Sequence, residues 1–168
     1  NFIIINKHLL SSIIFTGDVF SVPSYAKWRQ LDDVGADLII HVAPGNHDVL
    51  RPDSREAFQR SPYGQLEYPR SINTINGRVI LEDSISTDWT VSAKAVEMIN
   101  SDKSTPTIVA RHNIPVKELI LLANNYSGFG TDLDTVHTLN KKIQHNKTVW
   151  IIGDSGAFSE KPRLKCLN

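Results

Sequence analysis

The chain has 168 residues, 40% hydrophobic and 21% charged, which is the composition of an ordinary globular domain. Eighteen Lys and Arg balance eighteen Asp and Glu, so no basic field favours nucleic acid or an anionic membrane as a partner. No apolar run in the sequence approaches the roughly 20 residues of a membrane-spanning helix, and the single cysteine, Cys166, cannot form an internal disulfide. We therefore expect one globular domain over residues 1–168.

Short apolar runs alternate with segments of helical periodicity along the chain. Runs of three to six largely apolar residues bounded by turn formers predict strands, and apolar residues three and four apart predict helices. The predicted strands are residues 13–16, 38–42, 79–81, 107–110 and 147–152, the first of them buried. The predicted helices are residues 21–34, 91–100, 116–124 and 134–144. This alternation indicates an α/β fold with a largely parallel sheet, whose active site lies at the carboxyl ends of the strands.

Some details of two helices can also be predicted. In residues 21–34, Pro23 is expected in the first turn, Tyr25, Trp28 and Leu31 share one face, and Gly35 occupies the C-cap position. Thr90 is the expected cap of the helix over 91–100.

Two other segments depart from the alternation. Residues 2–10 are apolar with Lys7 and His8 interspersed, a pattern that fits the end of a helix or a short strand. Residues 49–78 hold most of the turn formers, and such long excursions are often functional or form a cap. The chain begins without Met and has no recognisable signal peptide. We expect a cytoplasmic protein whose domain is incomplete at the N-terminus, with the C-terminus open to the same interpretation.

Gly45-Asn46-His47-Asp48 is the most informative motif. It follows the apolar run 38–42 and a proline, so a tight loop is expected at the C-terminal end of a strand. An Asn amide oxygen and a His imidazole held side by side offer a metal ligand and a proton donor. Asp18 ends an earlier strand in the same manner, so a parallel sheet would bring it close to Asn46.

Two later strands also end in side chains that can bind metals, His112 and Asp154. Oxygen and imidazole donors suit Mn, Fe, Zn or Mg better than a metal that prefers thiolates. In order and context, these motifs resemble those of the calcineurin-like metallophosphoesterases. The matched residues are Gly17-Asp18, the motif at 45–48, and His112.

The resemblance implies a sandwich of two mixed sheets flanked by helices, with a binuclear metal centre. It implies that Asp18 bridges the metals and that Asn46 and His112 bind the second one. His47 would be the catalytic histidine, and Asp48 would orient it. The implied activity is hydrolysis of a phosphomonoester or phosphodiester by a metal-activated water. The implied partner is a small phosphorylated substrate; nucleic acid is not expected.

The sequence departs from the family pattern in two places. The family's opening Asp-x-His motif has no secure match, because Asn6-Lys7-His8 lies too close to the next strand for a parallel crossover. We interpret residues 2–10 as a helix before that strand and expect the first strand to be missing. The closing Gly-His-x-His motif reads Gly153-Asp154-Ser155-Gly156, in which Asp154 can donate an oxygen ligand and Gly156 cannot.

Both departures affect the first metal. The alternative to an enzyme is therefore a catalytically impaired scaffold that binds one metal and a protein partner. Residues upstream of Asn1 would decide between the two, if they supply the missing motif. The sequence does not determine the substrate, the native metal or the oligomeric state.

Each candidate also has a structural interpretation. Asp18 could cap a helix and Asn46 could occupy a turn, although the combined motifs favour metal binding. Asp154 is evenly balanced between a ligand and a turn residue. Arg111 could bind phosphate, but strand alternation should direct it away from the side of His112. The remaining histidines are predicted to be surface or structural residues, and two tryptophans to be core or cap residues: His8, His41, His137, His145, Trp28 and Trp89.

Overall fold

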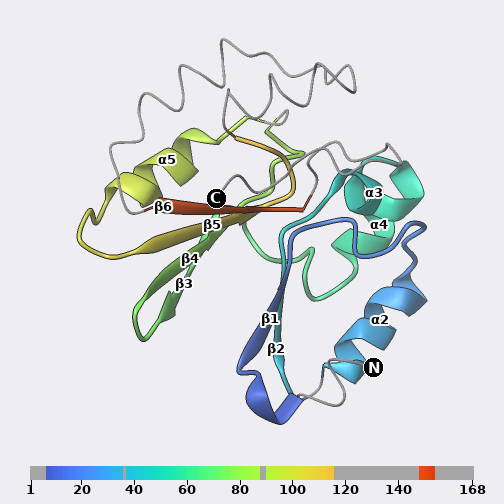
Figure 1. Cartoon of the computed structure of the whole chain (residues 1–168). Coiled ribbons are helices and arrows are strands. Elements are labelled where there is room, and N and C mark those ends of the chain that lie inside the picture. The colour runs from blue at the N-terminus through green and yellow to red at the C-terminus, as the bar shows by residue number, and fades with distance from the viewer. Residues whose placement is uncertain (1–6, 36, 88–89, 116–147, 154–168) are drawn as a thin grey trace, which may run out of the picture.

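The computed structural model of the chain describes residues 7–35, 37–87, 90–115 and 148–153. Strands within these residues form a two-stranded and a four-stranded sheet, joined by helices in a mixed α/β fold (Figure 1). The small sheet pairs β1 (Ser12–Phe15) with β2 (Ile39–Val42) in parallel. The large sheet has the order β3 (Arg70–Thr74), β4 (Gly77–Leu81), β5 (Thr107–Arg111) and β6 (Thr148–Ile152).

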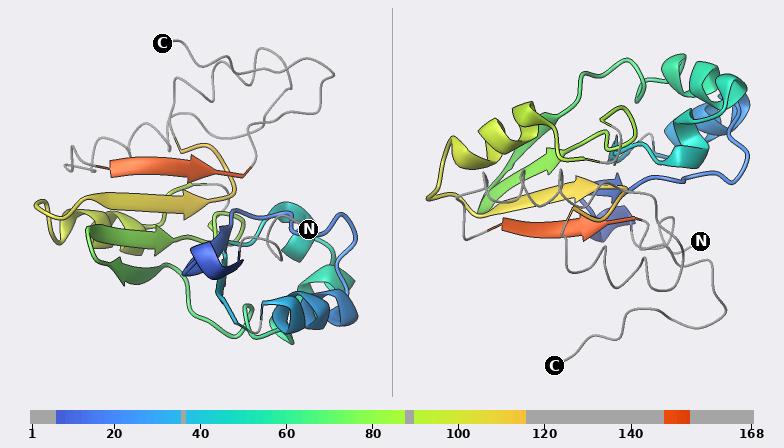
Figure 2. Two further views of the ribbon diagram at one scale, coloured as in Figure 1. Left: turned by 60° about the horizontal axis from the view of Figure 1, so that its bottom comes forward. Right: turned by 90° about the horizontal axis from the view of Figure 1, so that it is seen from above.

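The large sheet is mostly parallel. Strands β4, β5 and β6 run side by side in one direction (Figure 2), and β3 joins β4 as an antiparallel neighbour. The prediction of a largely parallel sheet is therefore confirmed for the described strands. All five predicted strands are present, each within two residues of its predicted bounds.

The described helical segments are short. They are η1 (Lys7–Leu9), α2 (Tyr25–Val34), α3 (Asn46–Val49), α4 (Pro52–Gln59) and α5 (Ala93–Asn100). Serine hydroxyls cap two of them: Ser24 Oγ accepts from Lys27 N, and Ser92 Oγ accepts from Ala95 N at 3.1 Å. Gly35 occupies the C-cap of α2, as predicted. No described helix is both long and apolar enough to cross a bilayer.

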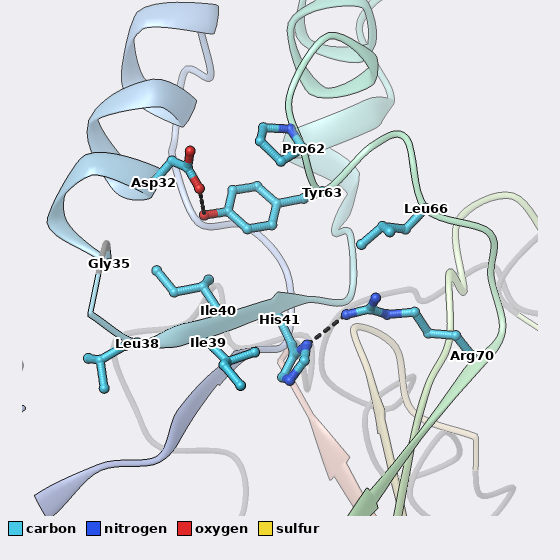
Figure 3. Close-up of a pocket in the computed structure, with 10 residues that line it drawn as sticks. All are labelled: Asp32, Gly35, Leu38, Ile39, Ile40, His41, Pro62, Tyr63, Leu66 and Arg70. Carbon is cyan, nitrogen blue, oxygen red and sulfur yellow. Dashed lines mark hydrogen bonds between the residues drawn. The ribbon is translucent and has the colours of Figure 1, made fainter.

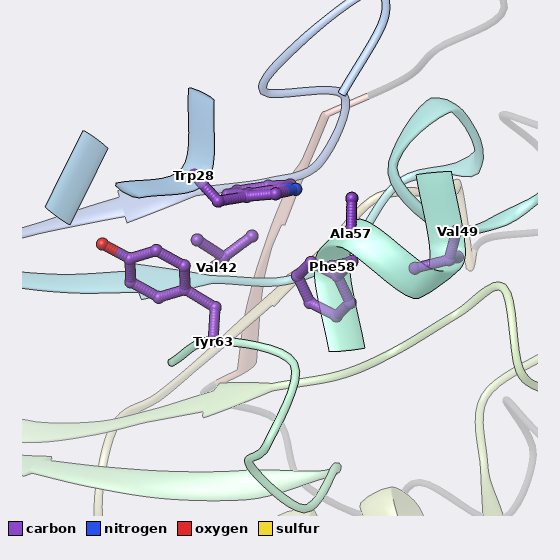
Figure 4. Close-up of a cluster of buried hydrophobic side chains, with 6 residues drawn as sticks. All are labelled: Trp28, Val42, Val49, Ala57, Phe58 and Tyr63. Carbon is purple, nitrogen blue, oxygen red and sulfur yellow. The ribbon is translucent and has the colours of Figure 1, made fainter. Parts of the chain in front are cut away.

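Alternating side chains of β1 divide the core into layers. Phe15 packs against a cluster centred on Trp28, to which α2 and α4 contribute (Figure 4). The Trp28 ring contacts Phe20 and Phe58 edge-on, with ring centroids 5.0 and 5.3 Å apart. Ile14 packs instead on the large sheet. The buried members of the Trp28 cluster are Trp28, Val42, Val49, Ala57, Phe58 and Tyr63.

The other face of the large sheet is covered by α5, because Ile99 packs on Ile80 and Val109. Figure 1 shows the same division, with α2, α3 and α4 gathered beside the small sheet and α5 beside the large one. The layers are therefore helices, small sheet, large sheet and helix. In this arrangement the carboxyl ends of β1, β2 and β5 meet, which positions the candidate site.

Several local predictions were wrong. Helix α2 begins at Tyr25 rather than at residue 21, because Ser24 caps it, so Pro23 precedes the first turn. Its predicted apolar face is only partly packed, with Trp28 buried and Tyr25 47% exposed. The cap of α5 is Ser92, while the Thr90 hydroxyl donates to the Thr87 carbonyl.

Further corrections concern residues interpreted as loops. Where a tight loop was expected, Gly45 caps the helical turn α3, which spans Asn46–Val49. The segment 49–78 contains α4 and β3, which the turn formers did not indicate. Pro52 starts α4 instead of a turn, because proline is well tolerated in the first turn of a helix. Strand β1 is half-exposed rather than buried.

Some predictions lie outside the described residues. These are the helices at 116–124 and 134–144, the first part of the segment 2–10, and the placement of Asp154, Trp89, His137 and His145. The described part of the segment 2–10 is residues 7–10, in which Lys7–Leu9 form a turn of 3-10 helix.

Candidate metal centre

The turn after β1 presents the carboxylate of Asp18. Gly17 and Asp18 both adopt positive φ, 93° and 51°, and Asp tolerates this left-handed conformation better than most residues. Asp18 Oδ1 accepts a hydrogen bond from His47 N at 2.8 Å, at the start of α3. This bond connects the loop after β1 to the start of α3, and Asp18 Oδ2 is directed towards His47 and His112.

Asp48 also connects the loop after β1 with the residues that precede α3. It is fully buried, and its Oδ2 accepts from the backbone N–H groups of Asp18 at 2.9 Å and Gly45 at 3.0 Å. Burial raises the pKa of Asp48 to about 6, and the N–H group of Gly45 opposes this shift. The hydrogen bonds of the Asp48 carboxylate are with backbone N–H groups rather than with the His47 imidazole, so any orienting effect on His47 is indirect, and that role stays a prediction.

Close approach of the loops explains the glycine that opens the 45–48 motif. A Cβ at position 45 would lie 2.4 Å from Asp18 N and Oδ1, and 2.9 Å from His112 Cε1. Any side chain there would push the two loops and His112 apart. The glycine therefore allows Asp18, Asn46 and His112 to share one space.

His112 brings the third loop into the centre. Its side chain is 1% exposed, and Nδ1 lies 2.9 Å from the Thr16 carbonyl oxygen. Because a carbonyl only accepts, Nδ1 carries a proton and donates to Thr16. Nε2 lies 2.9 Å from Asn46 Oδ1 and 3.5 Å from Asp18 Oδ2.

Three acceptor atoms therefore converge when the His112 ring is neutral. These atoms are His112 Nε2, Asn46 Oδ1 and Asp18 Oδ2, and their lone pairs repel one another unless a cation lies between them. A proton on Nε2 or a metal ion can fill that role. Metal-binding histidines usually donate their other N–H to a carbonyl or carboxylate, as His112 does to Thr16.

His47 lies at the edge of the centre. Its Nδ1 is 3.2 Å from the Ser21 carbonyl oxygen, and its Nε2 is 3.9 Å from Asp18 Oδ2. The side chain is 37% exposed, so a ligand in the centre can reach the ring. The arrangement places one accessible imidazole beside the buried His112 ring and the partly exposed Asp18 carboxylate.

Arg111 precedes His112 and points to the other side of the sheet, as strand alternation predicted. Its Nη1 donates to Glu82 Oε2 at 2.7 Å, with both side chains essentially unexposed. Nη2 donates to the Thr90 carbonyl, and Glu82 Oε1 accepts from Ser92 N. This arginine therefore anchors the start of α5 and does not line the candidate centre.

The end of β6 reaches the same region. Gly153 N donates to the carbonyls of Arg111 and His112, and a Cβ at position 153 would lie only 1.8 Å from the Thr16 oxygen. Asp154, the next residue, lies outside the described residues. The structure thus brings together Asp18, Asn46, His47 and His112 of the predicted site.

Two contacts of the centre were missed from the sequence: the Thr16 carbonyl that orients His112 and the Ser21 carbonyl that faces His47. Backbone acceptors leave no signal in residue identity. The role of Asp48 could have been found, because an acidic residue three positions after Gly45 fits a helix-capping pattern. The described residues contain no group of three or more His, Cys, Asp or Glu side chains placed to hold a metal; here two such side chains join an amide.

Comparison of the chain with protein-family models and with curated proteins finds no match.

Proposed function

We propose that the protein is a calcineurin-like metallophosphoesterase that hydrolyses a phosphomonoester or phosphodiester with the help of a divalent cation. The observation that carries the proposal is the convergence of Asp18 Oδ2, Asn46 Oδ1 and His112 Nε2 at the ends of β1, β2 and β5. The packing of a small sheet on a large one, with helices outside both, supports the sandwich that the sequence resemblance implies.

The donor set fits one divalent cation. A carboxylate, an amide oxygen and an imidazole match the preferences of Mn, Fe, Zn or Mg, and His112 already has its Nδ1 proton engaged by Thr16. Bound there, the cation would polarise phosphoryl oxygens and activate water for attack. Asp154 would contribute as a further ligand.

His47 supplies the proton to the leaving oxygen in this proposal. The Ser21 carbonyl holds the proton on Nδ1, so the protonated ring presents its second N–H, on Nε2, towards the centre. Asp18 Oδ2 lies at ion-pair distance from that nitrogen. Asp48 contributes indirectly, by holding the loops of Asp18 and Gly45 at a fixed separation.

Hydrolysis of p-nitrophenyl phosphate and bis(p-nitrophenyl) phosphate with Mn²⁺ tests the proposal and separates monoesterase from diesterase activity. We expect native turnover to require the metal and to be lost in His112→Ala. His8→Ala is the matched control, because His8 is exposed and lies outside the centre. Turnover that persists in excess EDTA and in His112→Ala would contradict the proposal.

A second candidate is a scaffold that binds one metal and a protein partner. One observation favours it: the described residues assemble donor atoms for a single cation. Tight Mn²⁺ binding without turnover of either ester would support this function over the enzyme.

A further inference from the structure

A cavity of about 310 Å³ lies beside β2, and none of the candidate metal ligands lines it (Figure 3). It is framed by the end of α2, by β2, by the segment after α4 and by Arg70 at the start of β3. Its volume is at the lower end of the range of roughly 300–1,000 Å³ found for small-molecule sites. Most of its wall is apolar, formed by Leu38, Ile39, Ile40, Pro62, Tyr63 and Leu66.

Arg70 introduces a positive charge into this wall. Its Nη2 donates to His41 Nδ1 at 2.6 Å, and its Nε is buried without a hydrogen-bond partner. No described carboxylate forms an ion pair with Arg70. The acid that lines the cavity, Asp32, instead accepts from Tyr63 Oη at 3.4 Å on the opposite wall (Figure 3).

His41 does not change this charge balance. A guanidinium only donates, so His41 Nδ1 must accept, and the ring is neutral in this arrangement. Burial, and the charge of Arg70 in addition, lower the pKa of His41. The cavity lining therefore includes one guanidinium that has no carboxylate partner among the described residues, beside an apolar surface and across from the Asp32 carboxylate.

Two other described arginines form ion pairs with carboxylates. Arg111 pairs with Glu82 in the core, and Arg60 pairs with Glu56 on the surface at 2.6 Å. A partly buried guanidinium with a desolvated Nε and no carboxylate is costly to keep unpaired. Arg70 is thus suited to an anion that comes from outside the described fold.

We propose that this β2 cavity binds a small organic carboxylate, with the carboxylate paired to Arg70 and an apolar body against the wall. A monoanion matches the single unpaired charge better than a phosphate dianion does. A compact ligand is favoured over an added peptide strand, because Tyr68 Oη already donates to the Val42 carbonyl at the end of β2, at 2.6 Å. The inference does not depend on the proposed phosphoesterase activity.

Titration calorimetry with matched acids and amides tests the proposal on the full chain. The probes are phenylacetate against phenylacetamide, and hexanoate against hexanamide. We expect at least one acid to bind about tenfold more tightly than its amide, and Arg70→Gln to remove that preference. Arg51→Gln is the matched control, because Arg51 is exposed and outside the cavity; it should keep the preference.

A second variant keeps the test decisive if Arg70→Gln does not fold. Leu66→Trp fills the cavity from a wall position that is 38% exposed, so the fold should tolerate it while acid binding is lost. The proposal is overturned if neither acid binds more tightly than its amide. It is also overturned if the preference survives in folded Arg70→Gln or in Leu66→Trp.

Discussion

Arg111 and His112 are consecutive, equally buried, and opposite in their electrostatics. Arg111 Nη1 lies 2.7 Å from Glu82 Oε2, so its positive charge is compensated within the protein. His112 Nε2 faces the side-chain oxygens of Asn46 and Asp18, so in the neutral ring one hydrogen-bond acceptor lies against two others. The first arrangement is complete without a ligand, whereas the second is complete only when a proton on His112 Nε2 or a metal ion lies between the acceptors. The difference separates a residue that stabilises the fold from one that is available for chemistry.

The largest expected effect follows from removing the negative charge at the candidate centre. In Asp18→Asn, the amide oxygen can still accept from His47 N, so the free energy of unfolding should change by at most about 1 kcal/mol. Phosphoesterase turnover should fall to background, because the anionic ligand is lost. Initial rates with Mn²⁺ measure this. Asp53→Asn, at an exposed carboxylate of α4, is the control, and unchanged turnover in Asp18→Asn would contradict the mechanism.

Breaking the buried pair of Arg111 and Glu82 should lower the stability of the fold rather than turnover alone. Glu82→Gln leaves Arg111 charged in the core, and we expect a loss of about 3–5 kcal/mol in the free energy of unfolding, measured with urea. Glu56→Gln breaks the exposed pair with Arg60 and should cost no more than about 0.5 kcal/mol. Equal effects of the two substitutions would show that the buried pair lacks the assigned role.

His47→Ala should separate catalysis from metal binding. Removing a proton donor typically lowers turnover about a hundredfold or more, whereas the donor atoms of Asp18, Asn46 and His112 stay in place. Turnover and elemental analysis on the same preparation distinguish the two effects. A variant that loses its metal along with its activity would assign His47 to metal binding rather than proton transfer.

The smallest effect concerns His41 and Arg70. The folded pKa of His41 lies below its ordinary value of 6.5, so below that pH the unfolded chain binds more protons than the folded one. The His41 contribution to stability is therefore present above about pH 6.5 and is lost as the pH falls. His41→Asn keeps an acceptor for Arg70 and should lose less stability than the native chain between pH 7.5 and 5.5, measured by urea unfolding.

Sequence patterns predicted five of the six described strands, because those five contain apolar runs between turn formers, whereas β3 is largely polar. They failed at the start of α2, where Ser24 caps the helix, and at α4, where Pro52 occupies the first turn. The proximity of Asp18 and Asn46 could be predicted because each follows a strand and neighbouring parallel strands end together. His112 follows a strand of the other sheet, so its approach depends on how the two sheets pack. The contact of Asp48 with Asp18 N and the contacts made by the Thr16 and Ser21 carbonyls depend on the separation of loops, which no local pattern contains.

The same limit applies to the β2 cavity. Arg70 and His41 are 29 positions apart and belong to different sheets. Neither residue lies in a recognisable motif, so only the folded structure reveals their contact and the unpaired charge. Sites built from long-range contacts between ordinary residues are therefore harder to predict than sites built on strand ends.

Metal content is the most direct test of the central claim that Asp18, Asn46 and His112 hold a divalent cation. The native chain and His112→Ala would be loaded with Mn²⁺, passed through gel filtration and analysed for metal. We predict about one Mn²⁺ or more per native chain and a clear loss in folded His112→Ala. Equal retention by both proteins, or no retention by the native chain, would contradict the claim.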